Sequence, residues 1–302
     1  MAEPHSLTPP SLHAAAAQRW LARVQPQAPW LHEEVGRRMQ ERLDWVTVKP
    51  RHWVDWMPHT GGWAAHDQVA QRYAQAACTV IEPDPARRLA AQRRLQKPWW
   101  ALSRWNAPPS DCLAQVQRPA DMVWANMSLH LSPDPQAWLA QWLDALAVDG
   151  FLMFSCLGPN SLRELRHAYA ARGWAPAHHE FTDMHDWGDM LLHAGFAEPV
   201  MDVEHITLTF STPERLLAEL RELGRNLHVA RFAGLRGRSW LAQWHTLWAD
   251  VQARQEPLTL TFEVVYGHAF KARPVARVKP QTTVALDDLR ASLRSRRQEP
   301  AA

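Results

Sequence analysis

The sequence predicts an α/β protein built on a mostly parallel, seven-stranded sheet with helices on both faces. Three observations predict it. Short apolar segments of strand length alternate with amphipathic segments of helical length. Carboxylates stand at the ends of the first two strands, at Asp55 and Glu82, where such a sheet places its ligands. Two longer segments, 200–210 and 258–270, then complete the sheet, the last strand running antiparallel.

The N-terminal part is expected to be helical before the chain enters the sheet. Residues 1–10 hold three prolines and are expected to be a disordered lead, followed by N-terminal helices within 11–46. The main domain is expected at 47–272. Its first elements are a strand at 52–56, a helix at 64–77, a strand at 78–83 and a helix at 85–96.

The second half continues the alternation. A strand begins at residue 120 and ends near Asn126, and a turn at Asp149-Gly150 precedes the next strand. Residues 213–254 are expected to form a helical insertion that covers the site as a lid, and 273–302 a flexible basic tail. The other expected elements are helices at 133–147, 161–173 and 186–196, strands at 151–158, 200–210 and 258–270, and lid helices at 213–227 and 239–254.

Composition excludes several functional classes. The formal charge is only +2 with no long run of like charge, so we expect no nucleic-acid partner. No apolar run reaches 18 residues and no signal peptide is visible, which predicts no membrane span and a cytoplasmic protein. Three dispersed cysteines form no CxxC pair and the 16 histidines form no HExxH motif, so no metal site is expected.

The segment after the first strand is the candidate ligand loop. It reads WVDWMPHTGGW, with Asp55 at the strand end and a Gly61-Gly62 pair that allows close approach of a ligand. Glu82 ends the second strand, 27 residues after Asp55, where a carboxylate accepts hydrogen bonds from ribose hydroxyls. An ordinary turn and an ordinary acidic strand end explain the same residues. The chain has only 12 glycines, which counts against an intact nucleotide loop.

Several segments, in one order across residues 12–270, resemble the malonyl-acyl-carrier-protein O-methyltransferases of biotin synthesis. The clearest are EEVGRRMQERLDWVTVKP, ADMVWANMSLHLSPDPQAWLAQWLDAL, DGFLMFSCLGPNSLRELRHAYA and ITLTFSTPERLLAELRELGRN. The resemblance implies a Rossmann-like class I methyltransferase fold, S-adenosylmethionine as cofactor, and an acyl carrier protein carrying a malonyl group as partner. It places the cofactor at Asp55, Thr60, Gly61, Glu82 and Asn126.

The departures from the family concern the same loop. Family members have the form D-A-G-C-G-T-G, whereas Met57 and His59 replace two glycines here and Pro58 removes an N–H donor. A family tyrosine near the substrate is replaced by Trp20. The acidic residue that approaches the adenine after the third strand has no counterpart in 103–111.

Methyl transfer to a malonyl carboxylate needs alignment more than acid–base chemistry, so no catalytic residue is assigned. Arg163 and Arg166 are candidates for holding the substrate carboxylate, although surface arginines often only face solvent. Asn126 either lines the cofactor's reactive end or caps a turn. Three functions stay open: this methyltransferase, one acting on another small acid, and an inactive relative that serves as a binding or scaffold protein. The oligomeric state is left open.

Overall fold

The computed structural model describes residues 9, 12–25, 27–96, 108–253 and 256–273. The chain divides into two units, Met1–Ala272 and Arg273–Ala302, and every element below belongs to the first. The expected disordered lead and basic tail lie outside the described residues, apart from Pro9 and Arg273.

A single seven-stranded sheet has the order β3-β2-β1-β4-β5-β7-β6. Neighbours from β3 to β5 are parallel, and β7 pairs antiparallel with both β5 and β6, which confirms the expected fold class. The strands are β1 His52–Trp56, β2 Ala77–Ile81, β3 Ser110–Leu113, β4 Ala120–Ala125, β5 Leu146–Leu157, β6 Phe196–Phe210 and β7 Leu258–Lys271.

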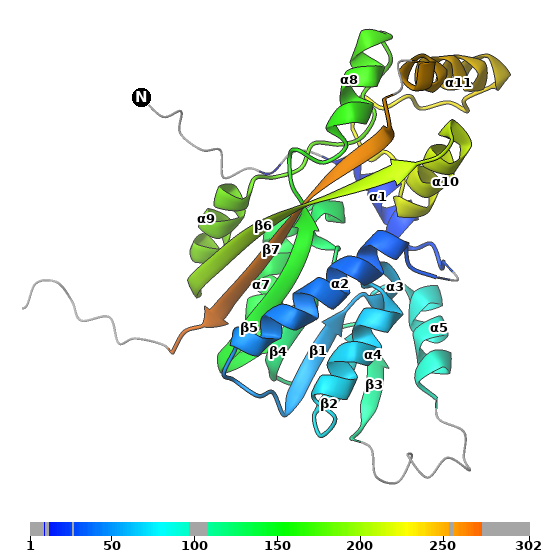
Figure 1. Cartoon of the computed structure of the whole chain (residues 1–302). Helices are drawn as coiled ribbons and strands as arrows, with labels where there is room; N and C mark the ends of the chain where they lie inside the picture. Colours follow the sequence, from blue (N-terminus) through cyan, green and yellow to red (C-terminus); the bar gives the residue numbers. More distant parts are fainter. Residues whose placement is uncertain (1–8, 10–11, 26, 97–107, 254–255, 274–302) are drawn as a thin grey trace, which may run out of the picture. The chain divides into compact units, whose positions relative to one another are not determined.

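Helices cover both faces of this sheet (Figure 1). The helices are α1 Ala14–Leu21, α2 Trp30–Arg42, α3 Pro58–Gly61, α4 Trp63–Arg72, α5 Pro85–Leu95, α7 Pro135–Ala145, α8 Arg163–Ala171, α9 Met184–Ala194, α10 Pro213–Leu223 and α11 Arg238–Ala253. Short 3₁₀ turns lie at Leu43–Trp45, after α2, and at Leu129–Leu131, after β4. No helix in the described ranges is both long and apolar enough to cross a membrane.

Alternation along the strands separates two apolar cores. On one face, Trp53 and Met122 pack with Leu31 and Val35 of α2. On the other, Val54 and Val123 pack with α7 and α9. Successive side chains of a strand point to opposite faces, so neighbouring residues of β1 belong to different cores. Both layers together fix the position of the strand ends.

Two features of the sheet differ from the sequence expectation. Asp149-Gly150 is not a turn between helix and strand but lies inside β5, where the pairing with β4 shifts register and Asp149 adopts φ 66°. An irregularity within the strand therefore stands where the sequence predicted a turn, and the strand continues through it. The short strand β3 was not predicted, because Ser110 and Asp111 are exposed and give no apolar run.

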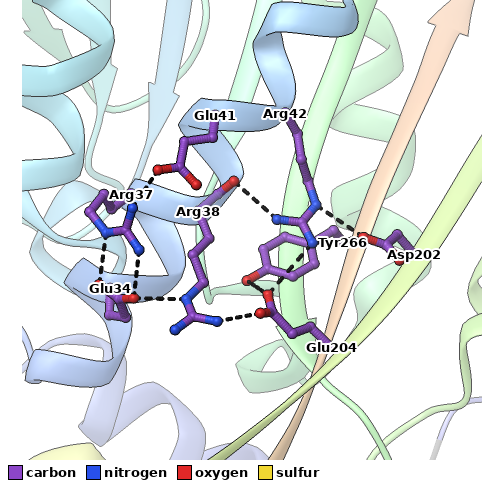
Figure 2. Close-up of polar contacts among 8 residues, drawn as sticks. All are labelled: Glu34, Arg37, Arg38, Glu41, Arg42, Asp202, Glu204 and Tyr266. Carbon is purple, nitrogen blue, oxygen red and sulfur yellow. Dashed lines mark hydrogen bonds and ion pairs between the residues drawn. The ribbon is translucent and has the colours of Figure 1, made fainter.

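Arginines tie α2 to the antiparallel edge of the sheet, as Figure 2 shows. Arg38 bridges Glu34 on its own helix to Glu204 on β6. Arg42 pairs with Asp202 at 2.7 Å and lies over the ring of Tyr266 at 3.7 Å. These contacts hold the helix that carries His32 and Glu33 toward the carboxyl ends of the strands.

Candidate functional site

The carboxyl ends of β1, β2 and β4 bring three of the predicted site residues into one buried region. Asp55 lies in register with Val80 of β2 and Trp124 of β4, so Glu82 and Asn126 follow directly at the same edge. Asp55, Glu82 and Asn126 are 2%, 0% and 1% exposed. Parallel strands end together, which is why residues up to 71 positions apart meet here.

Glu82 is held by the loop that follows β1. The backbone N–H of His59 donates to Glu82 Oε1 at 3.0 Å, and His59 Nδ1 lies 3.1 Å from the same oxygen. The other oxygen, Oε2, is buried with no hydrogen-bond partner among the described residues. A buried acceptor without a donor is costly, so Oε2 marks a place where a donor would be stabilised.

Asp55 is paired with a histidine of α4. Its Oδ2 lies 2.7 Å from His66 Nδ1, and both side chains are buried. Burial raises the pKa of the Asp55 carboxyl above its usual value, while the contact with His66 acts in the opposite direction. The Asp55 carboxyl group therefore faces His66 of the same chain.

The candidate ligand loop is folded into a short helix, α3. It begins after Met57, which adopts φ 58°, a conformation that costs a non-glycine residue about 1–2 kcal/mol. The carbonyl of Thr60 accepts a hydrogen bond from His32 Nδ1 at 2.6 Å. The hydroxyl of Thr60 accepts one from the buried Arg87 at 2.7 Å. Both polar groups of Thr60 are thus engaged.

Asn126 connects three parts of the molecule. Its side-chain amide donates to the carbonyl of His32 at 2.7 Å and to the carbonyl of Gly61. Its Oδ1 accepts from the hydroxyl of Ser155 on β5 at 2.7 Å. Gly61 packs so closely that an added Cβ would lie 2.8 Å from the Asn126 carbonyl oxygen. These contacts join the loop to α2 and β5, and a role of Asn126 at the cofactor stays a prediction.

A separate apolar cavity of about 500 Å³ lies beyond these residues. His32 of α2, His130 of the 3₁₀ turn after β4 and Tyr169 of α8 line it. Leu217 and Leu220 of α10 and Trp240 and Trp244 of α11 line it from the predicted insertion. Helices α10 and α11 therefore share a cavity with the strand ends, although whether they open and close as a lid stays a prediction.

Comparison with known proteins now bears on this arrangement. No family model matches the chain. The malonyl-[acyl-carrier protein] O-methyltransferase of Laribacter hongkongensis is 39% identical over 261 residues, 83% of this chain and 85% of the relative. The protein of that name from Gallionella capsiferriformans is 36% identical over 253 residues, 81% of this chain and 85% of the relative. The chain belongs to this family.

The resemblance seen in the sequence is thereby confirmed. Among solved structures, the YcgJ protein from Bacillus subtilis matches with a TM-score of 0.52 at 10% identity, covering 80% of this chain and 100% of that chain. At that identity the match supports the Rossmann-like fold alone.

With the loop as it stands, the residues do not fit the cofactor that the family resemblance implies. Glu82 Oε1 is taken by His59, and the Thr60 hydroxyl is taken by Arg87. The first N–H groups of α4, at Ala64 and Ala65, are capped by the carboxylate of Glu33. Of the two Glu82 oxygens, Oε2 has no hydrogen-bond partner among the described residues and is left as an acceptor for a ribose hydroxyl. A cofactor-bound form therefore requires a different conformation of Met57–His59.

Two further sequence expectations concern the substrate and the adenine. Arg163 is exposed and pairs with its neighbour Glu164 at 3.2 Å, and Arg166 is exposed and donates to the Pro159 carbonyl. Neither lines the apolar cavity, but Arg166 lines an adjoining pocket that shares Tyr169 and His178 with it. The residues after β3, 114–117, contain no acid. Of the segment 103–111, in which the sequence offered no counterpart, residues 103–107 lie outside the described residues.

Three residues that shape the site were not predicted. These are His32 and Arg87, which contact Thr60, and Glu33, which contacts the start of α4. His59 was expected to alter the loop, but its contact with Glu82 was not predicted. Pro58 at the first position of α3 was a usable signal for a helical turn. The other contacts join residues distant in sequence and leave no local pattern.

Buried histidines around the cavity make stability sensitive to acid. Burial lowers the pKa of His32 to about 4 and that of His178 to about 4, while hydrogen bonds to backbone act in the opposite direction. Burial also lowers the pKa of His179 to about 3. These rings are therefore neutral at pH 7.

We expect the free energy of unfolding to fall as the pH drops from about 6.5 to 4. The unfolded chain binds protons in this range that the folded rings do not, so each ring adds up to about 1.4 kcal/mol per pH unit. Urea denaturation at a series of pH values measures how the free energy of unfolding changes with pH. A His32→Asn, His178→Asn variant should have a shallower slope, with His167→Asn on the exposed face as control. An unchanged slope in the double variant would contradict this assignment.

Proposed function

We propose that this chain methylates the free carboxylate of a malonyl group that an acyl carrier protein carries as a thioester, with S-adenosylmethionine as methyl donor. The observation that carries the proposal is the 39% identity to a malonyl-[acyl-carrier protein] O-methyltransferase across 83% of the chain. We infer a role in biotin synthesis, and the three free cysteines support a reducing, cytoplasmic setting.

The apolar cavity suits the acyl end of such a substrate. A carboxylate is ionised at pH 7, so no general base is needed to make it a nucleophile. At the cavity floor it would meet the neutral rings of His32 and His130, whose pKa values are lowered by burial. Neutral rings leave the electron pair of the carboxylate oxygen available, and the cavity would exclude competing water. The insertion 213–254 would close this chamber.

Asp55, Thr60, Gly61, Glu82 and Asn126 stay the proposed cofactor-binding residues. Glu82 is the proposed ribose acceptor, supported by its unpaired Oε2. The loop would have to leave its helical turn before these residues could hold the cofactor. Arg163 and Arg166 could approach a substrate carboxylate only after a rearrangement.

A second candidate function is a relative that binds the carrier protein without transferring a methyl group. The contact of His59 with the fully buried Glu82 favours it, because that contact occupies one oxygen of the proposed ribose acceptor.

Mass spectrometry of malonyl carrier protein incubated with the chain and S-adenosylmethionine distinguishes the two. Gain of one methyl group on the malonyl arm supports the methyltransferase, and succinyl carrier protein tests whether another small acid is accepted. If a folded chain methylates neither carrier protein at an enzyme concentration equal to that of the substrate, the methyltransferase proposal is rejected in favour of the binding function.

A further inference from the structure

The segment 221–238, RELGRNLHVARFAGLRGR, is the most basic stretch of the described surface between β6 and β7. We call it the arginine segment. It holds five arginines against one acid, Glu222. Three large apolar side chains are exposed between them: Val229 at 55%, Phe232 at 51% and Leu235 at 98%. The segment thus combines positive charge with apolar groups that no described residue covers.

The charges of this segment are not neutralised within the described chain. Among the described residues, no ion pair joins any of its arginines to a carboxylate; the arginines are Arg221, Arg225, Arg231, Arg236 and Arg238. Arg225 donates to the carbonyls of Arg221 and Gly224, and Arg236 lies over the rings of Phe232 and Trp240. Carbonyl and aromatic contacts orient a guanidinium but leave its charge uncompensated.

Neighbouring cations increase the positive potential. Arg23 and Arg225 both approach the ring of Trp20, at 5.8 and 5.5 Å. Burial lowers the pKa of Arg225, and the charges of Arg23 and Arg221 lower it further. An unpaired group of like charges destabilises the free protein and is stabilised by an anionic partner.

The arginine segment also lines the apolar cavity on an exposed side, since Leu235 is 98% exposed. Arg221, Arg225, Leu235 and Arg236 line the same cavity that His32 and His130 close at the strand ends. A partner seated on the segment could therefore pass a narrow arm inward while its body stays outside. The arm would cross an apolar chamber of about 500 Å³ before its tip meets the floor.

We propose that the arginine segment is the docking surface for the acidic body of the acyl carrier protein, and that the cavity behind it receives the carrier's thioester arm. The proposal rests on the proposed function for the identity of the partner and holds for both candidate functions. Acidic side chains of the carrier pair with the arginines, and its apolar residues cover Phe232 and Leu235. Charge pairing at the rim orients the carrier, and the cavity binds the arm.

Charge reversal tests the docking surface. The variant Arg231→Glu, Arg238→Glu changes two arginines of the segment that do not line the cavity, one between α10 and α11 and one at the first residue of α11. The matched control is Arg93→Glu, Arg51→Glu, which changes an exposed arginine in the last turn of α5 and one before β1. Both variants alter net charge equally, so a nonspecific charge effect appears in both.

Binding of malonyl carrier protein is measured by calorimetry at two salt concentrations, and turnover is measured on that substrate and on the malonyl thioester of N-acetylcysteamine. We expect the first variant to lose about tenfold or more in carrier affinity and most of its salt dependence. Its turnover of the small thioester should equal that of the wild type, and the control should bind normally.

Equal losses in both variants, or wild-type affinity in the first, would overturn the docking proposal. So would a wild-type chain that does not bind the carrier, or that binds an RNA oligonucleotide more tightly than the carrier. If neither thioester is methylated while the binding pattern holds, the methyltransferase proposal fails and the docking surface stands. If the small thioester is methylated while the carrier does not bind, the docking proposal fails and the methyltransferase proposal stands.

Discussion

Replacing Met57 and His59 together by glycine is expected to raise the affinity of the chain for S-adenosylmethionine by about tenfold or more. The His59 ring lies 3.1 Å from Glu82 Oε1, so its removal uncovers the carboxylate at the end of β2. Glycine at position 57 also relieves the left-handed backbone that Met57 adopts, and the loop gains freedom to leave its helical turn. A gain of about 1.4 kcal/mol in binding free energy corresponds to tenfold.

Calorimetric titration of S-adenosylmethionine into both proteins measures this gain, with thermal unfolding as a check that both are folded. Glu82→Ala in the glycine background is the matched control. Loss of a charged acceptor costs about 1.5–3 kcal/mol, which should remove about tenfold or more of the affinity.

The outcomes separate the candidate functions. Binding by the wild type that Glu82→Ala abolishes supports an active enzyme whose loop opens. Binding only after both glycines are introduced supports a relative that lost its cofactor. A folded glycine variant with no gain over the wild type would show that His59 does not obstruct the site.

The fold was predictable because its signals are local and repeated. HWVDW at 52–56 was predicted as a strand and is β1 with the same bounds. The alternation of strands and helices then specified a parallel sheet. β3 escaped prediction because its four residues include two exposed polar ones, and only pairing with β2 makes it a strand.

The site was predictable in position but not in its internal contacts. Asp55, Glu82 and Asn126 were chosen because they end strands, and the topology brings those ends together. The pairing of His59 with Glu82 and the burial of Arg87 against Thr60 depend on side-chain rotamers and on a loop that folds as α3. No spacing rule encodes contacts of that kind, so the sequence showed an altered loop without showing how it closes.

Replacing Asn126 by alanine is expected to lower the free energy of unfolding by about 3 kcal/mol or more. The change leaves the buried carbonyls of His32 and Gly61 without the donor they share, and each such loss costs about 1–3 kcal/mol. It also removes the acceptor of the Ser155 hydroxyl. The loop, α2 and β5 would lose their common link, so the effect should exceed that of an ordinary buried polar substitution.

Urea denaturation measures the loss, and two variants calibrate it. Asn160→Ala, on an exposed residue, should change stability by less than about 0.5 kcal/mol. Asn126→Ser keeps a small donor, so its free energy of unfolding should fall less than that of Asn126→Ala. It also provides a folded protein if alanine is not tolerated. If Asn126→Ala is as stable as the wild type yet loses methyl transfer or cofactor binding, Asn126 acts on the ligand itself. A large loss of stability in alanine, partly recovered in serine, identifies Asn126 as the residue that holds the loop in place, because a side chain that only lined the ligand site would contribute little to the unliganded fold.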